Sequence, residues 1–264
     1  MREQSRVRSL RNLCFCSLGM AALIIAGTQA VQSGPEPSQS KKIEAPVTAQ
    51  SSPEGLQRKL RSERILASEG VPINRSLPYI ETEAEITPRT KEEVVQRALA
   101  LLVVAVKGEG LDQPSVKELI EQRGLAAYFT PKEIAFIQNE APSDDERLEF
   151  DARYEAAWTL LWALGYVDAL RKPTDLCDAA VAMRFMTRKT SAEFLAGAKL
   201  RPLSEILDQA DLIYRYDWAV VDGRVNGKIQ PTDLNEVVTQ QRHYALNWLI
   251  RYLDEEWDEI STDT

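Results

Sequence analysis

The sequence predicts an all-α fold: a single multi-helix, bundle-like domain that follows an N-terminal leader and a disordered tether. Residues that favour helices, chiefly Ala, Leu, Glu, Arg and Gln, dominate the chain from about Gly55 onward. Prolines recur at intervals that suit helix starts, because proline is tolerated in the first helical turn and disfavoured further inside. No run of alternating apolar and polar residues is long enough to predict a strand. Together these observations favour helices throughout the domain.

Caps indicate where the helices begin and end. In a capping box, a Ser or Thr and a Glu three residues later accept hydrogen bonds from each other's backbone amides. This pattern occurs at Thr90 with Glu93, at Thr130 with Glu133, and at Ser143 with Glu146. Glycines suited to helix C-termini are Gly108, Gly124, Gly165 and Gly223. The predicted helices cover residues 55–69, 90–107, 114–123, 131–139, 144–170, 175–188, 191–198, 203–222 and 232–254.

Two of these helices are expected to be central. Residues 98–106 are apolar on every side, which indicates burial within a bundle, and the stretch is too short to span a membrane. The helix over 232–254 also has apolar residues on most of its surface. Residues 70–88 are expected to form an extended, proline-punctuated crossing. Residues 219–229 are predicted to end a helix and enter a loop, with a small hairpin as the alternative.

The N-terminus has the pattern of an export segment. Four arginines within the first eleven residues precede an uncharged apolar run over residues 13–30. That run, 18 residues long, lies between the length of a cleavable segment, about 7–15 residues, and that of a spanning helix, about 20. Cleavage after Ala30 would release a soluble protein, whereas retention would leave a membrane anchor. Either outcome places the domain in the cell envelope, periplasmic or extracytoplasmic; a cytoplasmic protein with a fortuitous apolar N-terminus is the remaining alternative.

The domain organisation follows from these segments. Residues 1–30 are predicted to be a signal peptide or an N-terminal membrane anchor. Residues 31–56 are rich in Ser, Pro and Gln and are predicted to be a disordered linker, because few of them could offset the entropy cost of folding. Residues 57–264 are predicted to be the all-α domain.

Charge and cysteine content exclude several classes of function. The chain carries a net charge of −8, and residues 1–30 contribute +3, so the remainder carries −11. Such an acidic body argues against nucleic-acid binding and against docking on anionic lipid, so membrane contact is expected only through an uncleaved leader. Cys177 is the only cysteine beyond the leader, which excludes an internal disulfide there.

The candidate site surrounds the single histidine of the chain. Residues expected to form a polar pocket are Arg242, His243, Asn247, Trp257 and Asp258. An Asp or Asn would orient His243 as an acid or base. The alternative is a helix surface or a hydrogen-bonded buried cluster. No catalytic residue or cofactor is predicted. No metal site is predicted either, because one histidine cannot form a His-based metal site alone.

Several segments together resemble a bacterial family, the domain of unknown function DUF4272. They are Arg61–Leu66, Gly70–Asn74, Leu77–Pro78, Arg89–Leu101, Trp158–Gly165, Cys177–Asp178, Arg242–Trp248, Trp257–Asp258 and Thr262–Thr264. The resemblance covers roughly residues 57–264 and implies one helical domain. It implies no activity and no catalytic residues.

Two functional hypotheses follow. The first is a non-enzymatic interaction module that binds an envelope protein or a small molecule, since the domain is acidic, helical and tethered. The second is an uncharacterised enzyme that uses the five-residue pocket. The sequence does not predict an oligomeric state.

Overall fold

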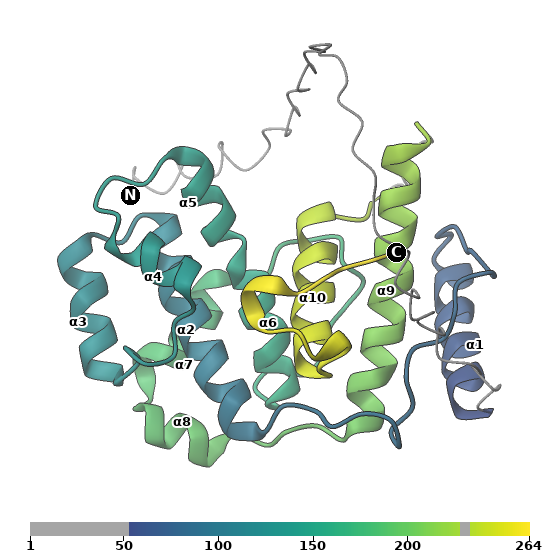
Figure 1. Cartoon of the computed structure of the whole chain (residues 1–264), viewed down its shortest axis with the longest axis horizontal. Helices are drawn as coiled ribbons and strands as arrows, with labels where there is room; N and C mark the ends of the chain where they lie inside the picture. The colour runs from purple at the N-terminus through teal and green to yellow at the C-terminus, as the bar shows by residue number, and fades with distance from the viewer. Residues whose placement is uncertain (1–52, 228–232) are drawn as a thin grey trace, which may run out of the picture. The chain divides into compact units, whose positions relative to one another are not determined.

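Helices account for the regular structure of the chain. The computed structural model describes residues 53–227 and 233–264, and within these ranges it contains no strand (Figure 1). All described residues belong to one compact unit, Ala49–Thr264. The predicted all-α fold is therefore confirmed. The predicted leader over residues 1–30, and the predicted linker up to residue 52, lie outside the described residues.

The helices follow the predicted order. Their bounds are α1 Pro53–Ser68, α2 Lys91–Glu109, α3 Gln113–Arg123, α4 Pro131–Gln138, α5 Asp144–Asp151, α6 Arg153–Ala163, α7 Ala179–Arg188, α8 Ser191–Gly197, α9 Leu203–Val225 and α10 Glu236–Leu249, followed by the 3₁₀ turns η2 Tyr252–Asp254 and η3 Trp257–Glu259. Residues 53–56, which the linker was expected to include, are part of α1.

Local capping chemistry fixes several helix starts. All three predicted capping boxes are present, at the starts of α2, α4 and α5. A fourth box starts α8, where Thr190 and Glu193 cap each other. Asp178 caps α7 and Asn235 caps α10, so these helices begin later than predicted, at residues 179 and 236. Side chains that satisfy exposed backbone amides thus decide where these helices begin.

The predicted helix over residues 144–170 is two helices. Helix α5 ends at Asp151 and α6 begins at Arg153, and α6 itself ends at Ala163. Gly165 follows with a φ of 76°, the left-handed conformation that glycine adopts without steric cost. Residues 219–221 continue α9, so the helix-end interpretation is confirmed in place of a hairpin for the described part of this region.

Helix α2 forms the centre of the apolar core. Every residue from Ala98 to Ala105 is at most 2% exposed. Helices α5 and α6 pack on α2, α10 packs on α6 and α9, and α1 packs on α9, as Figure 1 shows. The expected burial of this apolar stretch is confirmed.

Gly108 lies inside α2 and does not end it. A Cβ atom at this position would stand 2.5 Å from the backbone nitrogen of Asp151 and 2.7 Å from the carbonyl oxygen of Arg147. Glycine therefore allows α5 to approach the backbone of α2. The C-cap of α2 is Gly110, while Gly124 caps α3 as predicted and Gly223 lies within α9.

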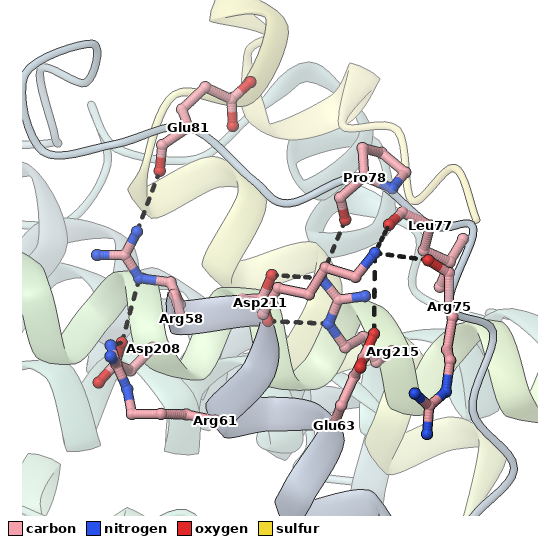
Figure 2. Close-up of polar contacts among 11 residues, drawn as sticks. Arg58, Arg61, Glu63, Arg75, Leu77, Pro78, Glu81, Asp208, Asp211 and Arg215 are labelled. Atoms are coloured by element: carbon pink, nitrogen blue, oxygen red, sulfur yellow. Dashed lines mark hydrogen bonds and ion pairs between the residues drawn. The ribbon is translucent and has the colours of Figure 1, made fainter. Parts of the chain in front are cut away.

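Charged side chains link helix α1 to α9 (Figure 2), and Leu66 of α1 is buried in the apolar core. The guanidinium of Arg58, a residue only 2% exposed, binds the Asp208 carboxylate at 3.1 Å and the Glu54 carboxylate at 2.8 Å. Arg61 also binds Asp208, at 2.6 Å. These residues form a charged seam between α1 and α9.

The same seam holds the crossing between α1 and α2. Arg215 of α9 donates two hydrogen bonds to Asp211, at 2.9 and 2.7 Å, and one to the carbonyl oxygen of Pro78 at 2.9 Å (Figure 2). Lys59 of α1 donates to the carbonyl oxygens of Arg75 and Leu77, at 2.7 and 2.5 Å. Residues 70–88 are non-helical, as predicted, and these contacts fix their path.

Candidate functional site

The five predicted site residues line three different pockets. Arg242 lines one pocket, His243 and Asn247 a second, and Trp257 and Asp258 a third. On α10, Arg242 separates from His243 and Asn247 because successive residues of a helix point about 100° apart, whereas residues four apart share a face. The structure brings His243 together with Asn247, and Trp257 with Asp258, but it does not place all five around one cavity.

Arg242 has a structural contact inside its pocket. Its side chain is buried, and its guanidinium donates a hydrogen bond to the carbonyl oxygen of Arg171 at 2.5 Å. Burial lowers the pKa of Arg242, and the Glu155 carboxylate partly opposes that shift. The pocket, about 220 Å³, is also lined by Lys172 and Tyr216. Arg242 thus fixes the loop that follows α6.

Trp257 holds the C-terminal segment on the domain. Its ring is 3% exposed and packs edge-on against Tyr244 and Trp248 of α10, with ring centroids 5.0 and 5.4 Å apart. The Tyr244 hydroxyl donates to the Trp257 carbonyl oxygen. The guanidinium of Arg97 lies over the indole, 5.1 Å from its centroid.

Asp258 continues the same attachment. Its carboxylate accepts a hydrogen bond from the backbone nitrogen of Lys132 at 3.1 Å, and its carbonyl accepts from the Lys132 ammonium at 2.8 Å. Trp257 and Asp258 also line an open groove of about 830 Å³ between this segment and the start of α4. Both residues dock the C-terminal segment.

His243 is oriented by a residue that sequence reasoning missed. Its Nδ1 lies 2.8 Å from the carboxylate of Asp217 on α9, and both residues are buried. A carboxylate accepts hydrogen bonds, so Nδ1 carries the proton and Nε2 presents a lone pair in the neutral ring. Among residues 53–227 and 233–264, the ring is hydrogen-bonded only through Nδ1.

The cavity that His243 lines, called the His243 pocket below, has a volume of about 280 Å³. Helices α9 and α10, the crossing near residue 79 and the end of the chain form its walls. Its polar and aromatic lining consists of His243, Asn247, Tyr79, Tyr214, Tyr252, Glu81, Asp263 and Thr264. None of the described residues that line it is Ser, Cys, Lys or Arg. Asn247 donates to the carbonyl oxygen of Ser261 at 2.8 Å, which holds the wall formed by the chain end.

The carboxylates give the His243 pocket a negative potential. Burial raises the pKa of Tyr252, and the charges of Asp263 and Glu81 raise it further. Burial also raises the pKa of Tyr214, partly opposed by the charge of Arg215. A negative environment disfavours a phenolate, which explains why the carboxylates act in the same direction as burial.

Two further features bound the chemistry of the described part. Within it, no group of three or more His, Cys, Asp or Glu side chains is arranged to hold a metal ion. No helix there combines the length and apolar character needed to cross a membrane.

The fold and the pocket define an all-α domain with one small, acidic and aromatic cavity beside a buried His–Asp pair. A family model, Domain of unknown function (DUF4272), matches residues 58–260, and the chain belongs to this family. The resemblance seen in the sequence is thereby confirmed. Comparisons with curated proteins and with solved structures give no match.

Proposed function

We propose that this protein is a non-enzymatic recognition domain of the cell envelope that binds its partner through the His243 pocket. One observation supports this most directly. The pocket combines the imidazole of His243, a buried residue, with aromatic rings and carboxylates, and its described lining holds no Ser, Cys or Lys that could act as a nucleophile. Such a cavity suits recognition of a polar group better than covalent catalysis.

The envelope location rests on the leader and the linker. In this proposal the domain works outside the cytoplasm, either soluble after cleavage at Ala30 or anchored by residues 13–30. The charge of −11 beyond residue 30 favours an envelope protein or a small molecule as partner, and disfavours nucleic acid.

Fractionation of native cells, with mass spectrometry of the N-terminus, tests the location. A chain that starts at Val31 in the soluble envelope fraction supports the cleaved form. An intact N-terminus in the membrane fraction supports the anchored form. An intact chain in the cytoplasm would overturn the envelope proposal.

An enzyme is the second candidate, and one contact favours it. The 2.8 Å distance between His243 and Asp217 is that of a general base oriented by a carboxylate. His243 would then take a proton from a water molecule at Nε2, and that water would attack the substrate. Both candidate functions therefore depend on His243. They differ in whether the bound molecule is chemically converted.

One experiment separates these candidates. The full-length protein is incubated with the small-molecule and peptide fraction of an envelope extract, and the mixture is compared by mass spectrometry with one containing His243→Gln. For a recognition domain we expect a component that the wild type retains unchanged and the variant releases. A component that only the wild type converts to a product would establish the enzyme instead. Gln240→Ala, at an exposed position of the same helix, is the matched control.

A further inference from the structure

We infer that the His243 pocket binds a primary ammonium group at the end of an alkyl chain, as in a diamine or a lysine side chain. The inference rests on the proposed recognition function and names the chemistry of the ligand. Its evidence comes from the charges, rings, hydrogen-bond acceptors and size of the pocket.

The charges around the pocket favour a cation. Glu81 and Asp263 contribute carboxylates, and the described lining contains no lysine or arginine. Two guanidiniums contact the backbone of the lining: Arg215 donates to the carbonyl oxygen of Pro78 at 2.9 Å, and Arg58 to that of Glu81 at 3.5 Å. Asp211 neutralises Arg215, and Glu54 and Asp208 neutralise Arg58. A bound cation would therefore meet the carboxylates of Glu81 and Asp263, while each of these guanidiniums is already paired.

The aromatic walls favour the same class of ligand. Tyr79, Tyr214 and Tyr252 line the pocket, and all three are half-buried. The face of an aromatic ring carries partial negative charge, which attracts ammonium groups. Tyr214 also stands beside the imidazole of His243, with ring centroids 6.0 Å apart. The Tyr214 ring and the imidazole are thus neighbours in the wall of the cavity.

The hydrogen-bonding groups point to a ligand that brings donors. His243 donates a hydrogen bond from Nδ1–H to Asp217, so in the neutral ring Nε2 can accept one. Asn247 uses its amide nitrogen to bind the Ser261 carbonyl, which leaves its amide oxygen to accept. An ammonium group has three donors and no acceptor, and it matches these groups. A carboxylate or phosphate could accept only from the tyrosine and threonine hydroxyls, and the carboxylates of Glu81 and Asp263 would repel it.

The size of the pocket limits what can enter. Its volume of about 280 Å³ is just below the usual range of small-molecule pockets, roughly 300–1,000 Å³. The cavity therefore suits the end of a chain and not a large ring system. A free diamine and a lysine side chain of a partner protein share this chemistry.

Binding of matched probes to the full-length protein tests the inference. The probes are n-butylammonium, neutral n-butanol and anionic butyrate, followed by ligand-observed NMR. We expect n-butylammonium to bind at least tenfold more tightly than the other two, and added NaCl to weaken it because salt screens the carboxylates. Asp263→Asn and Tyr252→Leu should each weaken it at least threefold. Tyr128→Leu, at an exposed tyrosine of the neighbouring groove, should leave it unchanged.

A second pair of probes separates the two sources of the ammonium group. Tighter binding of 1,4-diaminobutane than of Nα-acetyl-lysine methylamide assigns a free diamine, and the reverse assigns a lysine side chain. Nε-acetylation of the lysine probe removes its charge and should abolish binding.

The possible failures are distinguishable. If n-butanol binds as tightly as n-butylammonium, and both depend on Tyr252, the ammonium inference is overturned while the recognition function stands. If no probe of any charge binds the wild type better than Tyr252→Leu, both proposals fall.

Discussion

Helices α2 and α1 differ in the balance of apolar and charged contacts that hold them in the domain: α1 adds one buried core residue, Leu66, to its ion pairs. Residues 98–105 of α2 are apolar and at most 2% exposed, so burial of hydrocarbon holds this helix. Helix α1 contacts α9 through arginines and carboxylates, several of which are partly exposed. Asp208 binds two arginines, and its side chain is 42% exposed. Because salt and pH act on charges and hardly on hydrocarbon, the attachment of α1 is the more sensitive to solution conditions.

This difference matters for the site because the seam of α1 also positions one wall of the His243 pocket. Pro78 and Leu77 are held by Arg215 and Lys59, and the next residue, Tyr79, lines the pocket. A Cβ atom at Gly55 of α1 would lie 2.4 Å from the Tyr79 ring, so the ring packs directly on this helix. Loss of the seam would therefore move the pocket wall.

Removing Arg215, a buried arginine of the seam, should have the largest effect on stability. Arg215→Met leaves the carboxylate of Asp211, which is fully buried, without its partner. We expect a loss of about 3–5 kcal/mol in the free energy of unfolding, measured by urea denaturation with circular dichroism. The double variant Asp211→Leu, Arg215→Met should recover most of this loss. A single variant as stable as the wild type would contradict the importance of this pair.

The tight contact of α2 should come next. Gly108→Ala improves helix propensity by about 1 kcal/mol, but its Cβ would meet the backbone of α5 at 2.5 Å. Backbone cannot rotate aside, so the steric conflict dominates and we expect a net loss of about 1–3 kcal/mol in unfolding free energy. Glu92→Ala, at an exposed position of the same helix, is the control and should change stability little. A stabilised Gly108→Ala would disprove the close approach.

Acid should weaken the ion pair between Glu93, near the start of α2, and Arg251, just after the end of α10. Burial acts to raise the pKa of Glu93, but hydrogen bonds from Thr90, the charge of Arg251 and a hydrogen bond from Arg89 bring it below its ordinary value. A carboxyl group with a lowered folded-state pKa stabilises the fold above about pH 4.3, and this contribution disappears as pH falls through the folded pKa.

Glu93→Gln measures that contribution. Gln can still accept from Thr90, so the capping box survives. We expect the wild type to be roughly 0.5–1 kcal/mol more stable than Glu93→Gln at pH 7, and the two to be equal at pH 3, by urea denaturation. A gap that persists at pH 3 would show that the charge of Glu93 is not its cause.

The smallest effect is expected at the exposed edge of the seam. Arg61 and Asp208 keep 47% and 42% of their side-chain exposure, and exposed ion pairs contribute about 0–1 kcal/mol. Arg61→Ala should lower stability by less than 1 kcal/mol in low salt and by nothing measurable in 0.5 M NaCl. A loss as large as that of Arg215→Met would mean that the different burial of Arg61 and Arg215 does not determine how much each contributes to stability.

The sequence predicted features that depend on nearby residues. Thr90, Thr130 and Ser143 act within three residues of themselves, so their capping boxes could be recognised directly. Thr190 and Glu193 show the same pattern and could have been found by the same criterion. Gly108 was misassigned because its role depends on α5, about forty residues away, and no local pattern distinguishes a close approach from a C-cap.

The candidate site was predicted only in part, for a similar reason. His243 stands out as the single histidine, but its partner Asp217 lies on another helix, and helical periodicity does not tell which faces meet. The separation of Arg242 from His243 follows from helix geometry alone and could have been predicted. The path of the C-terminal segment could not, because Arg251, Leu253 and Asp254 adopt left-handed φ values of 55°, 53° and 56°, which residues other than glycine rarely do.

The wall formed by Asp263 and Thr264 has a practical consequence for anyone who prepares this protein. Residues fused after Thr264 would begin at the rim of the cavity. A cationic affinity tag placed there could reach the carboxylates and compete with an added amine, so that a binding assay would report the tag. Binding measurements should therefore use a cleavable tag whose removal leaves Thr264 as the last residue.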